Sequence, residues 1–303
     1  MRSIISRITG LSASWQSLPP TLRGIVYMSV STVCFTTLHA MVRHISDELH
    51  PFQLAFFRSI FGLLVFLPVL LRHGVEPFKT KRLSVHFLRG GLNIIAMLAF
   101  FYALSISPIA RVTALGFSAP IFTAFLSFFI LGERFKLHRW SAILMGFVGA
   151  LIILRPGIIP LDLGSFLVLL SAFMWGITMI VIKVLARTDS SMTITCYMGL
   201  LLAAFSLVPA IWVWRTPQFE TWFWLIAIGV VGTLAQLTIV QALKEGETTV
   251  VLPFDFLKMI WATMFGYWLF SETVDLWTWI GAAIIIGSGI YVAYRERLAR
   301  LQA

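Results

Sequence analysis

The sequence predicts an all-α integral membrane protein with ten transmembrane helices, and three of its features lead to this fold class. Apolar residues make up 59% of the 303-residue chain and charged residues only 12%, whereas soluble chains are about 45–50% apolar and about 25% charged. Apolar runs recur that have roughly the 20 residues a helix needs to cross a bilayer. Most lysines and arginines lie in short linkers between these runs.

The apolar runs follow one another with little chain between them, so consecutive helices are expected to pack antiparallel. No separate soluble domain is predicted. The expected spans are 23–44, 51–72, 83–106, 110–131, 138–155, 164–186, 192–214, 221–243, 248–270 and 276–294.

The linker charges predict the orientation. With the N-terminus inside, the linkers expected outside contain only four basic residues, and the other basic linker residues lie inside. Basic linkers favour the cytoplasmic side, which places both termini there, with tails at 1–22 and 296–303. The net charge of +10 is therefore assigned to topology, and no nucleic-acid partner is expected. The four outer residues are Arg43, Arg111, Arg155 and Arg215.

The two halves of the chain align with each other at an offset of 139–140 residues. Lys183 falls on Arg43 and Glu272 falls on Glu133. The sequence thus predicts two repeats of five helices, 23–155 and 156–295. Because five is odd, the second repeat must enter the membrane in the opposite sense, as in transporters with inverted repeats. The linker GERFKLHR is basic and its counterpart SETVDL is acidic, as opposite topologies require.

The stretch ALSISPIARVTALGFSAPIFTAFLSFFILGERFKLHRWSAILMGFVGALIIL resembles the drug/metabolite transporter superfamily, and within it the EamA-type branch. The second half keeps Ala242-Leu243, Ser271-Glu272 and Gly281 but lacks the arginine after Glu272. The segments FQLAFFRSIFGLLVFLP and VHFLRG resemble alphaproteobacterial-type carriers, which include S-adenosylmethionine carriers. Vitamin carriers, such as those for riboflavin, belong to the same broad family.

The resemblance implies a secondary transporter of the inner membrane that moves a small metabolite by alternating access. The substrate class implied is an amino acid, an S-adenosylmethionine-like compound or a vitamin-like compound. Two alternatives stay open, an exporter of drugs or toxic metabolites and a membrane scaffold that transports nothing. Direction of transport and a monomeric or homodimeric state are not fixed by the sequence.

Ionisable residues inside the membrane predict the transport site, because each is costly there and marks function by default. Asp255 and Lys258 are three residues apart, share a helix face and can pair. Lys258 is the candidate for a substrate carboxylate or phosphate, and Asp255 for a cationic group or a proton. A closed structural ion pair is the alternative. Arg58 either binds an anion through its planar fork or extends to the bilayer surface.

Polar and aromatic residues on neighbouring helices complete the candidate site, either as substrate contacts or as helix–helix packing. Two tryptophans could stack on a flat or cationic substrate, amides could hydrogen-bond it, and a histidine could relay protons. Two prolines mark helix interruptions, which often line transporter sites. These residues are Trp175, Trp261, Asn93, Tyr197, Gln236, His39, and the helix-breaking Pro120 and Pro253.

Small residues predict two close packing seams. One follows Ala142, Gly146 and Ala150 in the fifth helix, and the other follows Ala283 and Gly287 in the tenth.

No enzyme, cofactor or metal is expected. The chain contains no H-E-x-x-H, G-x-S-x-G or G-x-x-x-x-G-K-[ST] motif, which protease, hydrolase and nucleotide sites would require. A channel would need a repeated polar ring or filter loop. The loop residues His44, Asp47, Glu48 and His50 could hold a metal, but a solvated loop is the expected reading.

Overall fold

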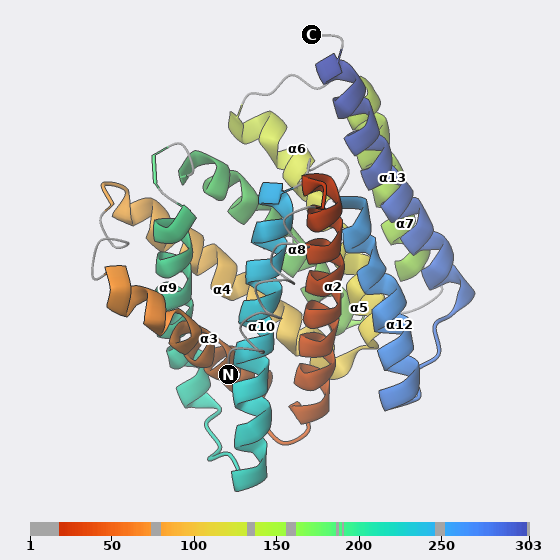
Figure 1. The fold of residues 1–303 in the computed structure, drawn as a ribbon. Coiled ribbons are helices and arrows are strands. Elements are labelled where there is room, and N and C mark those ends of the chain that lie inside the picture. The colour runs from red at the N-terminus through yellow and green to blue at the C-terminus, as the bar shows by residue number, and fades with distance from the viewer. Residues whose placement is uncertain are drawn as a thin grey trace.

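The computed structural model describes residues 18–73, 80–131, 137–155, 162–185, 188–189, 191–245 and 252–301, and over these ranges the protein is helical without any β-strand (Figure 1). The first half contributes α2 (Pro20–Ile45), α3 (Pro51–His73), α4 (Leu83–Ile106), α5 (Ile109–Gly116), α6 (Ala119–Leu131) and α7 (Leu137–Leu154). The second half contributes α8 (Leu163–Leu185), α9 (Ser191–Trp212), α10 (Phe219–Glu245), the 3-10 helix η2 (Leu252–Phe256), α12 (Leu257–Phe270) and α13 (Leu276–Leu301).

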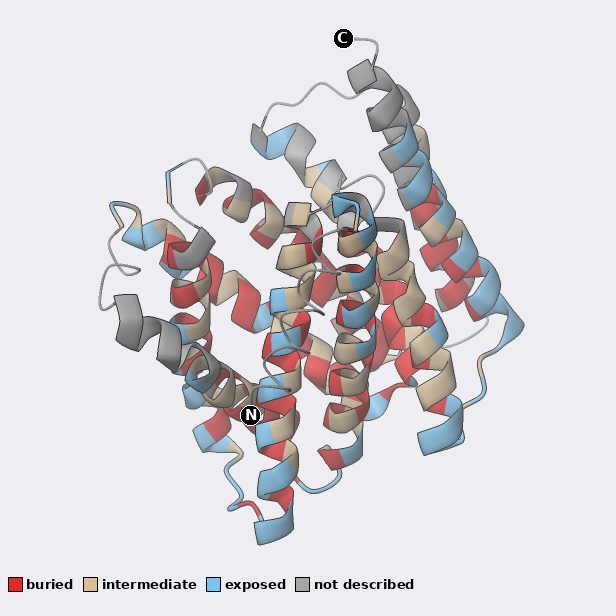
Figure 2. Cartoon of the chain, viewed as in Figure 1, coloured by how far each residue is buried: buried red, intermediate tan, exposed pale blue. Residues whose placement is uncertain are grey.

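Five helices in the described part of the chain are long and apolar enough to cross a membrane by themselves, and shorter apolar helices accompany them. Figure 2 shows exposed residues along these helices, and large apolar side chains such as Phe129 and Phe223 are among them. Water would solvate such surfaces poorly and lipid solvates them well. The prediction of an all-α membrane protein is confirmed. The five long spans are Leu22–Ile45, Leu83–Ile106, Leu163–Ile182, Thr193–Trp212 and Phe219–Ile239.

The structure differs from the expected spans at several ends. The last helix, expected over 276–294, continues to Leu301, so most of the predicted tail 296–303 is helical. The expected helix 110–131 is interrupted between α5 and α6. In place of a continuous helix over 248–270, an α-helix begins only at Leu257, after η2. Residues 1–17 and 246–251 lie outside the described residues.

Both interruptions lie next to a proline. Pro120 is the second residue of α6 and Pro253 the second residue of η2. Proline has no N–H to donate, so it fits the first turn of a helix, where that donor has no partner. The two interruptions also meet in space, because the rings of Phe117 and Phe256 contact each other edge to face with centroids 5.1 Å apart.

Two matching helix pairs each join a helix of the first half to a helix of the second half. The helix α2 packs on α10, and α4 packs on α8. In the first pair Ser31 Oγ donates to the Ala235 carbonyl at 2.9 Å. In the second pair Ser171 Oγ donates to the Ala96 carbonyl at 2.7 Å. The offset of 139–140 residues that aligns the halves carries Ser31 onto Ser171 and Ala96 onto Ala235.

The helices α7 and α13 lie side by side and approach through glycine (Figure 1). A Cβ built on Gly281 would lie 2.5 Å from the Gly149 carbonyl oxygen, and one on Gly149 would lie 2.8 Å from the Gly281 carbonyl oxygen. Gly287 forms no packing seam within the described part of the chain, because a Cβ there would meet nothing within 4 Å, and a seam between protomers stays a prediction. Gly146 is tightly packed, with Ile121 of α6 and Ser288 of α13 as neighbours.

Candidate functional site

The ion pair between Lys258 and Asp255 lies where η2 passes into α12. Lys258 Nζ is 2.6 Å from Asp255 Oδ1, and both side chains are mostly buried. The ammonium also lies 4.8 Å from the centroid of the Phe35 ring on α2, within the range of a cation–π contact. The pair predicted from the three-residue spacing is therefore formed, next to the helix interruption.

The α2 helix brings further polar groups to this pair. Trp261 Nε1, one turn after Lys258, donates to Thr32 Oγ1 at 3.2 Å. The His39 ring lies 6.3 Å from the Phe35 ring and 4.9 Å from the Phe100 ring, between centroids. We call Asp255, Lys258, Phe35, His39 and Trp261 the Lys258 cluster.

Arg58 of α3 lies near the same region. His39 is close enough to both Arg58 and Lys258 for each cation to act on it electrostatically. Arg58 Nη1 lies 3.4 Å from the Met97 sulfur of α4, and its Nε is buried with no hydrogen-bond partner. A Cβ on Gly232 of α10 would lie 3.1 Å from that Nε, so the glycine leaves room for the guanidinium.

The two candidate amides, Asn93 and Gln236, lie on α4 and α10, the helices that contact Arg58. Asn93 is buried and lies one turn before Met97 on α4. Gln236 is half-buried and lies one turn after Gly232 on α10. Residues four apart share a helix face, which places both amides on the faces that meet Arg58.

Two other candidates lie elsewhere. Trp175 is half-buried on α8, and the next residue, Gly176, packs closely on Phe122 of α6. Tyr197 of α9 stacks on His86 with centroids 4.5 Å apart.

The Tyr197 stack belongs to a second polar cluster between α4 and the start of α9. His86 Nε2 lies 2.7 Å from Asp189 Oδ2, and Thr80 Oγ1 donates to the same oxygen at 2.6 Å. The hydrogen bonds from Thr80 and His86 lower the pKa of Asp189, which lies in the linker before α9. The buried Arg89 donates to the Ile194 carbonyl at 2.7 Å. Sequence reasoning missed this cluster because its members are distant in the chain.

Ion pairs that the sequence did not predict join the two halves at the other end of the bundle from the His86–Asp189 pair. Arg43 Nη2 lies 3.4 Å from Glu272 Oε1, and Arg111 Nη1 lies 3.4 Å from Asp162 Oδ2. Arg155 pairs with Asp275. Three of the four basic residues expected in outer linkers therefore have carboxylate partners in the second half.

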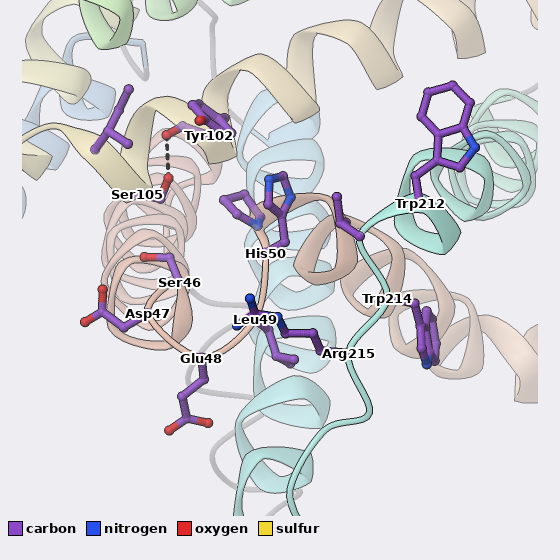
Figure 3. A pocket seen from close by; sticks show the side chains of 13 residues that line it. Ser46, Asp47, Glu48, Leu49, His50, Tyr102, Ser105, Trp212, Trp214 and Arg215 are labelled. Atoms are coloured by element: carbon purple, nitrogen blue, oxygen red, sulfur yellow. Dashed lines mark hydrogen bonds between the residues drawn. The ribbon is translucent and has the colours of Figure 1, made fainter.

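A groove of about 590 Å³ opens at this same end. Figure 3 shows that it is bordered by the loop from Ser46 to His50, the end of α4 and the segment that follows α9. Thr221 Oγ1 donates to Glu48 at 2.8 Å. Burial, and then the charge of Arg215, lower the pKa of His50. Among the described residues no group of three or more His, Cys, Asp or Glu side chains is arranged to hold a metal ion.

Comparison with known proteins identifies the family. The EamA-like transporter family matches the chain twice, over residues 22–155 and 162–294. An S-adenosylmethionine uptake transporter of Rickettsia felis is 31% identical over 278 residues, covering 92% of this chain and 95% of the relative. A riboflavin transporter of Vibrio cholerae is 31% identical over 280 residues, covering 91% of this chain and 94% of the relative.

A solved crystal structure shares the fold, with a TM-score of 0.62 at 19% identity over 92% of this chain and 99% of that one. The resemblance drawn from the sequence is confirmed by the family match. The chain belongs to the EamA-like transporter family of the drug/metabolite transporter superfamily and is a multi-pass protein of the inner membrane.

Proposed function

We propose that this protein is a secondary carrier that moves a small metabolite by alternating access, with its binding site at the Lys258 cluster. The observation that carries the proposal is a buried ion pair, Lys258 with Asp255, at the junction of two interrupted helices. Replacing a purely structural buried pair by apolar residues is often neutral or stabilising. Interrupted helices with polar groups at their ends are a common construction of transporter sites.

The proposed architecture has ten membrane crossings in two inverted repeats, 23–155 and 156–295, with both termini in the cytoplasm. The family matches twice, over ranges close to these. The equivalent serine contacts of Ser31 and Ser171 support the same division. Rocking one repeat against the other would expose the site to each side in turn.

In this proposal Lys258 binds an anionic group of the substrate and Asp255 a cationic group or a proton. Arg58, Asn93, Gln236 and His39 contribute from α3, α4, α10 and α2, and Trp261 stacks on the substrate. Trp175 and Tyr197 are proposed to contact the substrate elsewhere along the translocation path, with Tyr197 near the cytoplasmic end beside His86.

The substrate class is proposed from the relatives. Those named as S-adenosylmethionine and riboflavin transporters share flat heteroaromatic substrates, and an aromatic side chain beside a cation suits such compounds. Export of drugs or toxic metabolites and a scaffold without transport are the competing functions. Saturable flux would exclude the scaffold, and turnover far below channel rates would exclude a pore.

Counterflow in proteoliposomes tests the carrier function. Purified protein would be assayed with labelled amino acids, S-adenosylmethionine and riboflavin. We expect saturable counterflow of one compound and a decrease of about 10- to 100-fold in the Lys258→Ala variant, the range expected for losing a hydrogen bond to a charged group. Lys81→Ala is the matched control, since Lys81 is exposed in the linker before α4. Unchanged counterflow in Lys258→Ala would remove Lys258 from the site.

Proton coupling through Asp255 has its own test. If Asp255 carries the coupled proton, wild-type flux should respond to a pH gradient across the liposome membrane. The Asp255→Asn variant should lose this response, because the amide cannot ionise, and should retain counterflow in the absence of a gradient. An Asp255→Asn variant that responds to the gradient as the wild type does would rule out this role.

A further inference from the structure

The charges at the proposed site do not balance. Two basic residues, Lys258 and Arg58, lie close enough to His39 to act on it electrostatically, and one carboxylate, Asp255, pairs with Lys258. Lys258 already has its partner at 2.6 Å. No carboxylate in the described part of the chain lies within 4.0 Å of Arg58. Arg58 is half-buried with its Nε fully buried, and a cation in such a place is costly without an anion.

The hydrogen-bonding capacity of Arg58 is also largely unused. A guanidinium has five N–H donors. Its one hydrogen bond within the described residues is to the Met97 sulfur at 3.4 Å, which is a weak acceptor. Its Nε is buried and has no hydrogen-bond partner among those residues. Because buried donors are normally satisfied, this pattern indicates a site that awaits an acceptor with oxygen atoms.

The surroundings of Arg58 suit such an acceptor. Gly232 leaves room for the guanidinium on the α10 side, since a Cβ there would lie 3.1 Å from the Arg58 Nε. The Asn93 and Gln236 amides lie one turn from the residues that contact Arg58, and each carries two N–H donors. The carboxylate side chain of Asp255 is engaged by Lys258 and does not compete for the guanidinium.

We propose that Arg58 determines specificity by binding an oxyanion of the substrate, a carboxylate or a phosphate, through two parallel N–H···O bonds. The proposal rests on the carrier function proposed above and narrows it. Arg58 matches both oxyanions because its planar fork presents two donors to two oxygens. Lys258 adds a second positive charge to the anion site, and analogues without the oxyanion bind poorly.

Matched pairs of compounds test this inference by binding and by counterflow. One pair is S-adenosylmethionine and its decarboxylated analogue, and the other is riboflavin 5′-phosphate and riboflavin. In each pair only one member has the oxyanion. Binding is measured as the shift of the thermal unfolding midpoint of purified protein in detergent. In one of the two pairs, wild type is expected to bind the member with the oxyanion about 10- to 100-fold more tightly than the member without it. Selectivity in the first pair would identify a carboxylate site, and selectivity in the second pair a phosphate site.

Three variants separate specificity from folding. Arg58→Gln should lose the preference for the oxyanion, so that both members of the pair bind equally weakly. Arg58→Lys keeps the charge but not the fork and should retain part of the preference. Lys258→Gln leaves the two-donor fork of Arg58 in place and should retain more of the preference than Arg58→Gln does.

The outcomes for the inference and for the carrier function are distinct. Equal binding of both members of each pair by wild type, or an unchanged preference in Arg58→Gln, would overturn the role of Arg58 whether or not the protein transports. Oxyanion-selective binding without saturable counterflow would sustain the role of Arg58 and count against the carrier. Selective binding together with selective counterflow would support both.

Discussion

The Gly281→Ala variant is expected to unfold at a markedly lower temperature than the wild type. A Cβ at this position would lie 2.5 Å from the Gly149 carbonyl oxygen and 2.5 Å from Ile153 Cγ1, so α7 and α13 would have to separate. Overpacking of this kind costs about 1–3 kcal/mol. The contact with a backbone atom puts the cost at the upper end, offset by about 1 kcal/mol of helix propensity gained from alanine. We expect a net loss of about 2 kcal/mol in the free energy of unfolding, measured by thermal unfolding in detergent.

Gly287→Ala on the same helix is the matched control. A Cβ at Gly287 would meet nothing within 4 Å. The same substitution should therefore leave the midpoint unchanged or raise it slightly through helix propensity. Equal midpoints for the two variants would show that the close approach of α7 and α13 does not limit stability.

The Glu272→Ala variant is expected to lose about 3 kcal/mol of stability. Glu272 is positioned by the end of α12, where Ser271 adopts a left-handed conformation with φ 54° and the Glu272 N–H donates to the Gly266 carbonyl at 3.0 Å. Its Oε2 accepts the N–H of Ile109, the first residue of α5, at 2.9 Å. Its Oε1 faces Arg43 at 3.4 Å. Alanine would leave the start of α5 without its acceptor and Arg43 without its carboxylate, although Arg43 Nη1 would still donate to the Leu104 carbonyl at 3.0 Å.

Thermal unfolding checks this prediction against Glu220→Ala, which removes an exposed carboxylate in the first turn of α10. That control should lie within about 0.5 kcal/mol of the wild type. A Glu272→Ala variant as stable as this control would mean that the contacts to Ile109 and Arg43 contribute nothing measurable.

The environment of Glu272 also predicts that the stability of the protein depends on pH. Burial raises the pKa of this carboxyl above its ordinary value of 4.5, although the N–H of Ile109 and the charge of Arg43 oppose the shift. The folded state therefore holds the proton more tightly than the unfolded chain. The part of the stability that comes from this raised pKa is fully present below pH 4.5 and is lost as the pH rises through the folded-state pKa, whereas the contacts with Ile109 and Arg43 remain. The Glu272→Gln variant should lack this decrease, which a series of unfolding midpoints against pH would show.

The sequence by itself determined the membrane class, the approximate spans and the family. Hydropathy over a window of about 20 residues is a local property, and the spans that it predicted differ from the structure mainly at their ends and at the two interruptions. The contact between Lys258 and Asp255 was also predictable, because residues three apart on a helix must share a face. Prolines predicted where the helices would be interrupted.

Only the tertiary structure decided what surrounds those elements. Arg58 contacts Met97 and Gly232, which lie on helices distant in the sequence. Glu272 contacts Ile109 and Arg43, which are equally distant in the chain. Tyr197, a candidate from the sequence, stacks on His86 of a helix distant in the chain. Helical periodicity fixes which residues share a face of one helix. The crossing geometry between helices, set by side-chain packing over the whole bundle, fixes which faces meet.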